Sequence, residues 1–189
     1  MDSITFGTRV RIVSKSEFNN AINSNFKNID NWTLKGIKKG ERLVSRGMCD
    51  CGFVLGKGYG IEANGMHICP TYKENKLKSI IEHLKKWINP LEEQEAIIVG
   101  GKENNVNSPQ SMKFVDSYIK TMEESNIPCS YFVGGDFEND VAYSGMKDEF
   151  LIGNELINET SKKIFGTPQR AIEKIFSKFK IADCDEISW

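Results

Sequence analysis

Short runs of apolar or alternating residues recur along the chain, and runs of this length predict β-strands. They comprise residues 9–14, 41–45, 52–55, 66–69, 96–99, 129–133, 141–143 and 149–152. The last two runs are close enough in sequence to pair as an antiparallel hairpin. Residues 24–40 are instead rich in Asn, Lys and Gly, which predicts a loop with little regular structure.

Other stretches space their apolar residues three and four positions apart, which predicts amphipathic helices. These stretches are residues 14–26, 75–89, 108–126 and 167–179. Two of them begin with Ser-Pro or Thr-Pro, the cap-then-proline order that favours a helix start. The glycine-containing segments 57–60 and 64–65 predict turns. The pattern as a whole favours an α+β fold, in which a mixed, largely antiparallel β-sheet or sandwich core is flanked by helices.

The composition is that of one ordinary globular domain spanning residues 1–189. At 39% hydrophobic and 27% charged residues, the chain can bury a sizeable core. A net charge of -1 without a basic cluster argues against a nucleic-acid partner. No apolar run approaches the ~20 residues of a membrane span, and residues 1–11 lack the apolar core of a signal peptide. We therefore expect a monomer in the reducing cytoplasm, or one secreted into host cells without a cleaved signal peptide.

Cysteine and histidine gather in one part of the sequence. Cys49 and Cys51 lie in the segment that leads into the run 52–55, and His67 follows after a glycine-rich turn. If runs 52–55 and 66–69 pair as a hairpin, Cys51 and His67 become neighbours on adjacent strands. An imidazole beside a thiol can take its proton and so generate a thiolate nucleophile.

Three further features bear on this pair. Cys51 is preferred to Cys49 as the nucleophile because Gly52 and the apolar run follow it directly. Ser45, on the preceding strand, can accept a hydrogen bond from the other imidazole N–H and fix the tautomer. Backbone N–H groups around Asp50 and Cys51 can form an oxyanion hole.

Plainer interpretations stay open on the residues alone. A free cysteine is more often a small buried hydrophobe, and a nearby histidine is often only a packing residue. Cys49-x-Cys51 and His67-x-Cys69 also offer four zinc ligands, two on each arm of the hairpin. Residues two apart on a strand share a face, so all four could converge. The alternative function is therefore a small zinc-binding structural or interaction domain, and a third is a catalytically inactive binding module.

The order of motifs resembles the bacterial protein-glutamine deamidases, a superfamily that includes the chemotaxis deamidase CheD, the catalytic domain of cytotoxic necrotizing factor and the Burkholderia lethal factor. The resemblance covers roughly residues 41–153, with N- and C-terminal additions outside it. The matching segments are Ser45, Cys51, residues 52–55, 64–70, 97–101, 111–128, 132–136 and 141–153. The sequence departs from the superfamily at Cys49-Asp50, where related proteins have small residues. The carboxylate of Asp50 is expected to raise the pKa of the Cys51 thiol. Ser45 also stands where related enzymes often have threonine.

The resemblance implies a cysteine-dependent amidohydrolase without cofactor or metal. Cys51 would be the nucleophile, His67 the general base and acid, and Ser45 the residue that orients the imidazole. The substrate would be a glutamine side chain on a partner protein, converted to glutamate, with transglutaminase activity when an amine replaces water. We expect either a chemotaxis role or, given the additions at both ends of the chain, a bacterial toxin or effector.

Overall fold

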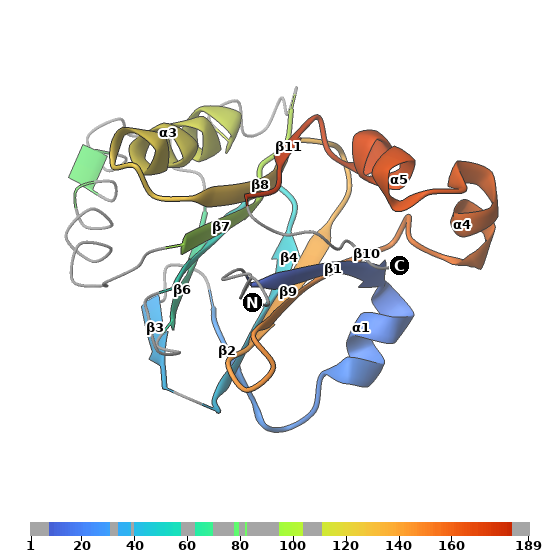
Figure 1. Ribbon diagram of the computed structural model, residues 1–189, viewed down its shortest axis with the longest axis horizontal. Helices are drawn as coiled ribbons and strands as arrows, with labels where there is room; N and C mark the ends of the chain where they lie inside the picture. The colour runs from blue at the N-terminus through green and yellow to red at the C-terminus, as the bar shows by residue number, and fades with distance from the viewer. Residues whose placement is uncertain are drawn as a thin grey trace, which may run out of the picture.

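The computed structural model describes residues 8–30, 34–38, 40–57, 63–69, 78, 79, 82, 95–103 and 111–182. Within these residues the chain forms a five-stranded and a six-stranded mixed sheet, mostly antiparallel, together with four helices (Figure 1). The fold is therefore α+β, as the hydrophobic pattern predicts. No helix of the described part is both long and apolar enough to cross a membrane.

The five-stranded sheet, sheet A, has the order β1-β10-β9-β4-β2. Its strands are β1 (Arg9–Ser14), β10 (Glu149–Asn154), β9 (Asn139–Ser144), β4 (Arg42–Met48) and β2 (Phe26–Asn28). The two edge strands are parallel to their neighbours, and β9 is antiparallel to both β10 and β4. The register of β4 against β9 shifts between Ser45 and Met48, which marks a β-bulge.

The six-stranded sheet, sheet B, has the order β11-β8-β7-β5-β6-β3. Its strands are β11 (Lys178–Lys180), β8 (Cys129–Val133), β7 (Glu95–Gly100), β5 (Gly52–Lys57), β6 (Ala63–Ile68) and β3 (Leu34–Ile37). Within sheet B, only β7 and β8 are parallel to each other. Helix α3 (Ser111–Glu124) lies between them in the chain, because a parallel pair needs a long crossover connection. In the β5–β6 pair, Gly52 faces Ile68 and Phe53 faces His67.

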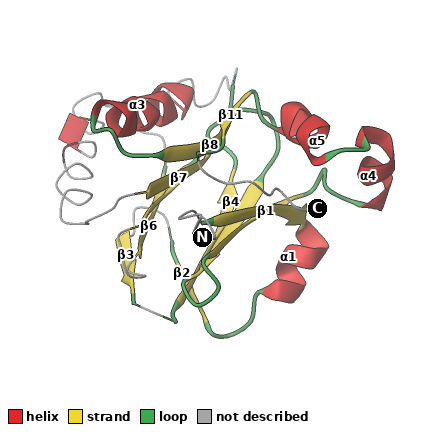
Figure 2. Ribbon diagram, viewed as in Figure 1, coloured by secondary structure: helices red, strands yellow, loops and turns green. Residues whose placement is uncertain are grey.

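The two sheets pack face to face and share the largest core cluster, which contains residues of β1, β4, β9 and β10 together with residues of β5, β6, β7 and β8. Helix α3 covers the outer face of sheet B through a second cluster, and α1 (Lys15–Ala21) covers the outer face of sheet A with its buried Phe18 (Figure 2). Helix α5 (Pro168–Ile175) contributes to the shared core, and α4 (Glu159–Phe165) precedes it. The molecule is thus a β-sandwich with helices outside it.

Several predicted elements differ in the structure. Residues 24–40, predicted as loop, contain β2 and β3, and the predicted helix 14–26 ends at Ala21. The predicted turn at 64–65 is wrong, because both residues lie within β6. A Cβ on Gly65 would lie 2.8 to 2.9 Å from side-chain atoms of Ile29, Leu43 and Phe53, so this glycine serves close packing across the sandwich.

Other differences lie near the helices. The sequence pattern did not predict α4 or β11, and the last predicted helix stops at Ile175. Thr167 caps that helix ahead of Pro168, as predicted. The predicted helix 75–89 lies outside the described residues except for 78, 79 and 82, which are helical, and the predicted start at 108–109 also lies outside them. The predicted turn at 57–60 is likewise outside, apart from Lys57 in β5.

Candidate active site

The predicted histidine and serine meet across the sandwich. Ser45 lies on the inner face of β4 in sheet A, and His67 lies on β6 in sheet B. The Ser45 hydroxyl oxygen is 2.8 Å from His67 Nδ1 and 2.8 Å from the carbonyl oxygen of Ile29. Ile29 directly follows β2, and its own N–H donates to the Val44 carbonyl, which holds the Ile29 carbonyl beside Ser45.

These contacts determine which ring nitrogen of His67 carries the proton. The Ile29 carbonyl can only accept, so the single hydroxyl proton of Ser45 is donated to it. Ser45 must then accept from His67 Nδ1–H, which leaves Nε2 unprotonated in the neutral ring. Burial lowers the pKa of His67, an effect that the Asp30 carboxylate partly offsets, so the neutral ring is favoured. The side chain of His67 is almost fully buried, and its Nε2 has no hydrogen-bond partner within the described structure.

Cys51 lies close to His67. It directly precedes β5, is half-buried, and its Sγ is 3.1 Å from the Sγ of Cys69. The two sulfur atoms and a ring nitrogen of His67 all lie within 4.8 Å of one another. Because Nδ1 is engaged by Ser45, Nε2 is the nitrogen available to the thiols. The structure therefore brings together the three residues that the sequence singled out, and adds Cys69 to them.

The thiol of Cys51 is protonated in the resting molecule. Burial raises its pKa, and the neighbouring Cys69 and Asp50 raise it further. The contribution of Asp50 has the sign expected from the sequence. A protonated thiol and a neutral imidazole are therefore the resting forms that these pKa directions favour.

The backbone of Cys51 is held on both sides. The carbonyl of Asp50 accepts a hydrogen bond from the hydroxyl of Ser111, at 2.7 Å, and the carbonyl of Cys51 accepts from Gly101 N, at 3.1 Å. Ser111 is fully buried at the start of α3 and also accepts from Lys102 N. A Cβ on Gly100 would lie 2.2 Å from the Cys51 carbonyl oxygen, so only glycine allows β7 this close. Gly100 and Gly101 therefore both lie against the backbone of Cys51.

The backbone that leads from Ser45 to Cys51 passes through the β-bulge in β4. The carboxylate of Asp140 accepts from Gly47 N at 2.9 Å and pairs with Arg46 at 3.3 Å and Lys15 at 2.8 Å. Gly47 has a φ of 75°, in the left-handed region that favours glycine. Asp140 therefore sets the path of the chain between Ser45 and Cys51.

Cys49 lies apart from the reactive group. It is half-buried in the same bend as Cys51, but it does not belong to the cluster of Cys51, His67 and Cys69. Burial raises its pKa, against a lowering influence of Lys102. The four zinc ligands considered from the sequence are therefore three in the structure.

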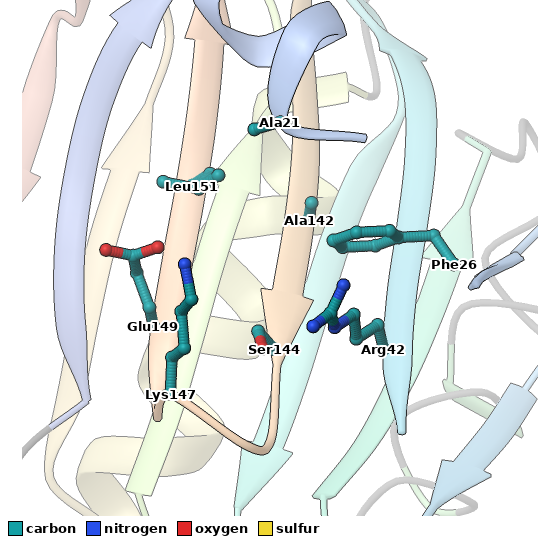
Figure 3. Close-up of a pocket in the computed structure, with 8 residues that line it drawn as sticks. All are labelled: Ala21, Phe26, Arg42, Ala142, Ser144, Lys147, Glu149 and Leu151. Carbon is teal, nitrogen blue, oxygen red and sulfur yellow. The ribbon is translucent and has the colours of Figure 1, made fainter. Parts of the chain in front are cut away.

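A pocket elsewhere is separate from this site. It lies on the outer face of sheet A, the face that α1 covers (Figure 3). Its lining consists of Ala21, Phe26, Arg42, Ala142, Ser144, Lys147, Glu149 and Leu151. It contains no thiol or imidazole, so it adds nothing to the chemistry of Cys51 and His67.

Sequence reasoning missed several residues that shape the site. Ile29 was placed in a loop, and neither Ser111 nor Asp140 belongs to a local motif. Cys69, by contrast, is among the candidate zinc ligands that the sequence offers on the second arm of the predicted hairpin. The assembled thiol, unprotonated ring nitrogen and orienting hydroxyl suit nucleophilic attack on a carbonyl carbon. No protein-family model matches this chain, and no curated protein matches it significantly.

Proposed function

We propose that this protein is a cysteine-dependent protein-glutamine deamidase. Cys51 is the nucleophile, His67 is the general base and acid, and Ser45 orients the imidazole. The observation that supports this most is the chain of contacts from the Ile29 carbonyl through Ser45 to His67 Nδ1. It leaves Nε2 buried, unprotonated and without a hydrogen-bond partner in the described structure, while a ring nitrogen of His67 lies within 4.8 Å of the Cys51 sulfur. A general base needs such a free nitrogen, which closes on the thiol when substrate is bound.

The reaction has two halves. In the first, the Cys51 thiol gives its proton to His67 Nε2 as Sγ attacks the carboxamide carbon of a glutamine side chain. His67 returns that proton to the departing nitrogen, so ammonia leaves and a thioester forms. In the second half, His67 Nε2 takes a proton from water, whose oxygen attacks the thioester and releases glutamate and the Cys51 thiol. An amine in place of water gives transglutamination instead.

The pKa directions fit this sequence of steps. A base that is neutral at physiological pH can accept a proton at once, and burial keeps His67 neutral. The thiol proton is transferred during attack, since the raised pKa of Cys51 disfavours a resting thiolate. General base catalysis of this kind contributes typically about 10²–10⁴-fold to the rate. Backbone N–H groups of Asp50 and Cys51 are the proposed oxyanion donors.

The substrate we propose is a glutamine exposed on another protein, with a role as a bacterial toxin or effector, or in chemotaxis. Cys51 and Cys69 are both partly exposed, so the sulfur is accessible to a side chain that projects from a partner surface. The N-terminal strand β1 and the C-terminal strand β11 lie outside the region that resembles the chemotaxis deamidase. Each nevertheless forms an edge strand of one of the two sheets.

The test compares the wild-type chain with Cys51→Ala and with Cys49→Ala as the matched control. Each is incubated with glutamine-rich proteins such as casein and with bacterial and host lysates. Released ammonia is measured, and peptides are searched by mass spectrometry for glutamine converted to glutamate. We expect conversion with the wild type and with Cys49→Ala, and none with Cys51→Ala. Full activity of Cys51→Ala would end the proposal.

A zinc site is the second candidate function, because Cys51, His67 and Cys69 hold three donor atoms within 4.8 Å of one another. Structural zinc sites almost always have four protein ligands, so a three-ligand group is one short unless the chain supplies another. Metal analysis of the protein purified without added metal separates the candidates. Stoichiometric zinc that is lost in Cys69→Ser would favour the metal site and would occupy the nucleophile.

A further inference from the structure

Cys69 takes no part in the proposed reaction, yet it is placed directly opposite the nucleophile. Gly52 faces Ile68 in the antiparallel β5–β6 pair. Cys51 directly precedes Gly52 and Cys69 directly follows Ile68, so the same register places the two cysteines opposite each other. Their sulfur atoms are 3.1 Å apart. Both cysteines are free and partly exposed, so small molecules in solution reach them.

This placement meets the geometric needs of a disulfide. Facing residues of an antiparallel pair have Cα atoms about 4.5 or 5.5 Å apart, according to their hydrogen bonding. Disulfides join Cα atoms roughly 4.4–6.8 Å apart, with a bond near 2.05 Å. The 3.1 Å contact therefore closes by about 1 Å, which side-chain rotation alone can supply.

We propose that Cys51 and Cys69 form a reversible disulfide when the protein meets a hydroperoxide, and that this bond holds the nucleophile in an inactive state. The effect on activity rests on the proposed function, whereas the formation of the bond does not. The bond is an oxidative modification of a cysteine pair and protects Cys51 from further oxidation.

The chemistry balances with the hydroperoxide as the oxidant. His67 takes the proton of Cys51, and the sulfur attacks the distal oxygen of the hydroperoxide, giving a sulfenic acid on Cys51 and an alcohol, or water when the oxidant is hydrogen peroxide. The thiol of Cys69 then attacks the Cys51 sulfur, the S–S bond forms, and the hydroxyl leaves as water. Two thiols lose two electrons and two protons in all, and the peroxide O–O bond is reduced.

Of the cysteines that the structure describes, the other two do not have this placement. Cys49 lies outside the cluster of Cys51, His67 and Cys69, and Cys129 is buried on β8. Cys49→Ser is therefore the matched control, because it removes a neighbouring thiol and leaves the pair intact.

The experiment treats the wild-type chain and the variants Cys51→Ser, Cys69→Ser and Cys49→Ser with one equivalent of hydrogen peroxide. Free thiols are then blocked under denaturing conditions, and the protein is digested with trypsin without reduction. Cleavage after Arg46, Lys57 and Lys73 leaves Cys49 and Cys51 in peptide 47–57 and Cys69 in peptide 58–73. A joined pair of these peptides reports the bond, and deamidase activity is measured before and after dithiothreitol.

We expect joined peptides in the wild type and in Cys49→Ser, and none in the other two variants. Oxidised wild type should lose nearly all activity and regain it with dithiothreitol. Cys69→Ser should be active before oxidation and should not recover afterwards, because its sulfenic acid oxidises further. Loss of the cross-link in Cys49→Ser, or its absence in the wild type, would overturn the proposal. If the cross-link forms but no chain deamidates any substrate, the disulfide stands and the proposed function fails.

Discussion

Ser45 Oγ and His67 Nδ1 lie 2.8 Å apart, and their contact joins sheet A to sheet B inside the sandwich. Neither sheet alone can build the site, because the hydroxyl and the imidazole come from different sheets while Cys51 lies beside the imidazole. The packing of the two sheets therefore determines the chemistry. A change that breaks this contact removes the group that fixes the tautomer of His67.

Removal of the Ser45 hydroxyl should reduce activity more than stability. In Ser45→Ala, His67 Nδ1 loses its acceptor and the imidazole can rotate or change tautomer, so we expect kcat/KM to fall by at least about ten-fold. Ser45→Thr keeps the hydroxyl and should restore most of that activity, although its methyl group in a fully buried position costs roughly 1–3 kcal/mol. Steady-state kinetics and thermal unfolding of both variants check this. Equal kcat/KM in wild type and Ser45→Ala would contradict the orienting role.

Stability should fall with acid through His67. Burial lowers the pKa of His67 in the folded chain, whereas the unfolded chain has an imidazole with a pKa of about 6.5. Below that pH the unfolded chain binds a proton that the folded chain does not, so protons favour unfolding. The stability associated with neutral His67 is present above about pH 6.5 and is lost as the pH falls through the lowered folded value. We expect the Tm of the wild type to drop more steeply than that of His67→Gln below about pH 6.5.

The groups that face His67 are Ser45, Cys51 and Cys69, with Asp30 acting through its charge. Asp30 raises the pKa of His67, so Asp30→Asn should move the acid limb of kcat to lower pH. The loss of Tm in the same variant should still begin near pH 6.5, but it should continue to lower pH and become larger in total. A shift to higher pH in Asp30→Asn, or identical profiles for wild type and His67→Gln, would show that another group titrates.

Ser111 should matter for catalysis as well as for folding. Ser111→Ala leaves the Asp50 carbonyl and the Lys102 N–H without their hydrogen-bond partner, which costs about 1–3 kcal/mol for buried groups. It also frees the peptide that precedes Cys51, so kcat should fall even at temperatures where the variant is folded. Ser117→Ala is the matched control on the same helix, since its hydroxyl donates to the Lys113 carbonyl one turn earlier in that helix. A kcat loss as large in Ser117→Ala would refute the positioning role.

Two substitutions of Asp140 separate the effect of its charge on activity from the effect of its hydrogen bond to the β4 bulge. Asp140→Asn keeps an oxygen that can accept from Gly47 N but loses the ion pairs with Lys15 and Arg46. Asp140→Ala loses both, so the path from Ser45 to Cys51 is no longer fixed. We expect kcat/KM near the wild-type value for Asp140→Asn and a clear loss for Asp140→Ala, measured where both are folded. Equal losses in the two variants would mean that the charge, and not the bulge, matters.

Polar residues at the far end of β5 should affect stability alone. Lys57 lies at the opposite end of that strand from Cys51 and pairs with Asp148 and, at 3.9 Å, with Glu95, which also accepts from Thr8. Lys57→Met leaves two carboxylates near each other and should cost about 1–3 kcal/mol. Denaturant unfolding should show this loss while kcat/KM of the folded protein stays unchanged. A large drop in kcat/KM would show coupling between the two ends of the sandwich.

The sequence predicts that Ser45, Cys51 and His67 lie close together better than it predicts the structure that holds them. Cys51 and His67 follow from the hairpin pattern, and Gly52 facing Ile68 is the register that brings them together. The Asp50 carbonyl and Ser111 are 61 residues apart, and Gly47 and Asp140 are 93 apart. Contacts over such separations leave no periodic pattern in one sequence. Residues 26–28 were missed because so short an edge strand depends on its neighbour β4 and not on its own composition.

In the proposed mechanism Cys51, with His67 as its base, attacks the side-chain carbonyl of glutamine. The most direct measurement is covalent labelling with a glutamine analogue that carries an electrophile in place of the amide, followed by mass-spectrometric mapping. We predict a single adduct on Cys51 in the wild type, unchanged labelling in Cys49→Ser, and much slower labelling in His67→Gln. Labelling of Cys49 in place of Cys51, or labelling at an equal rate in His67→Gln, would contradict the account.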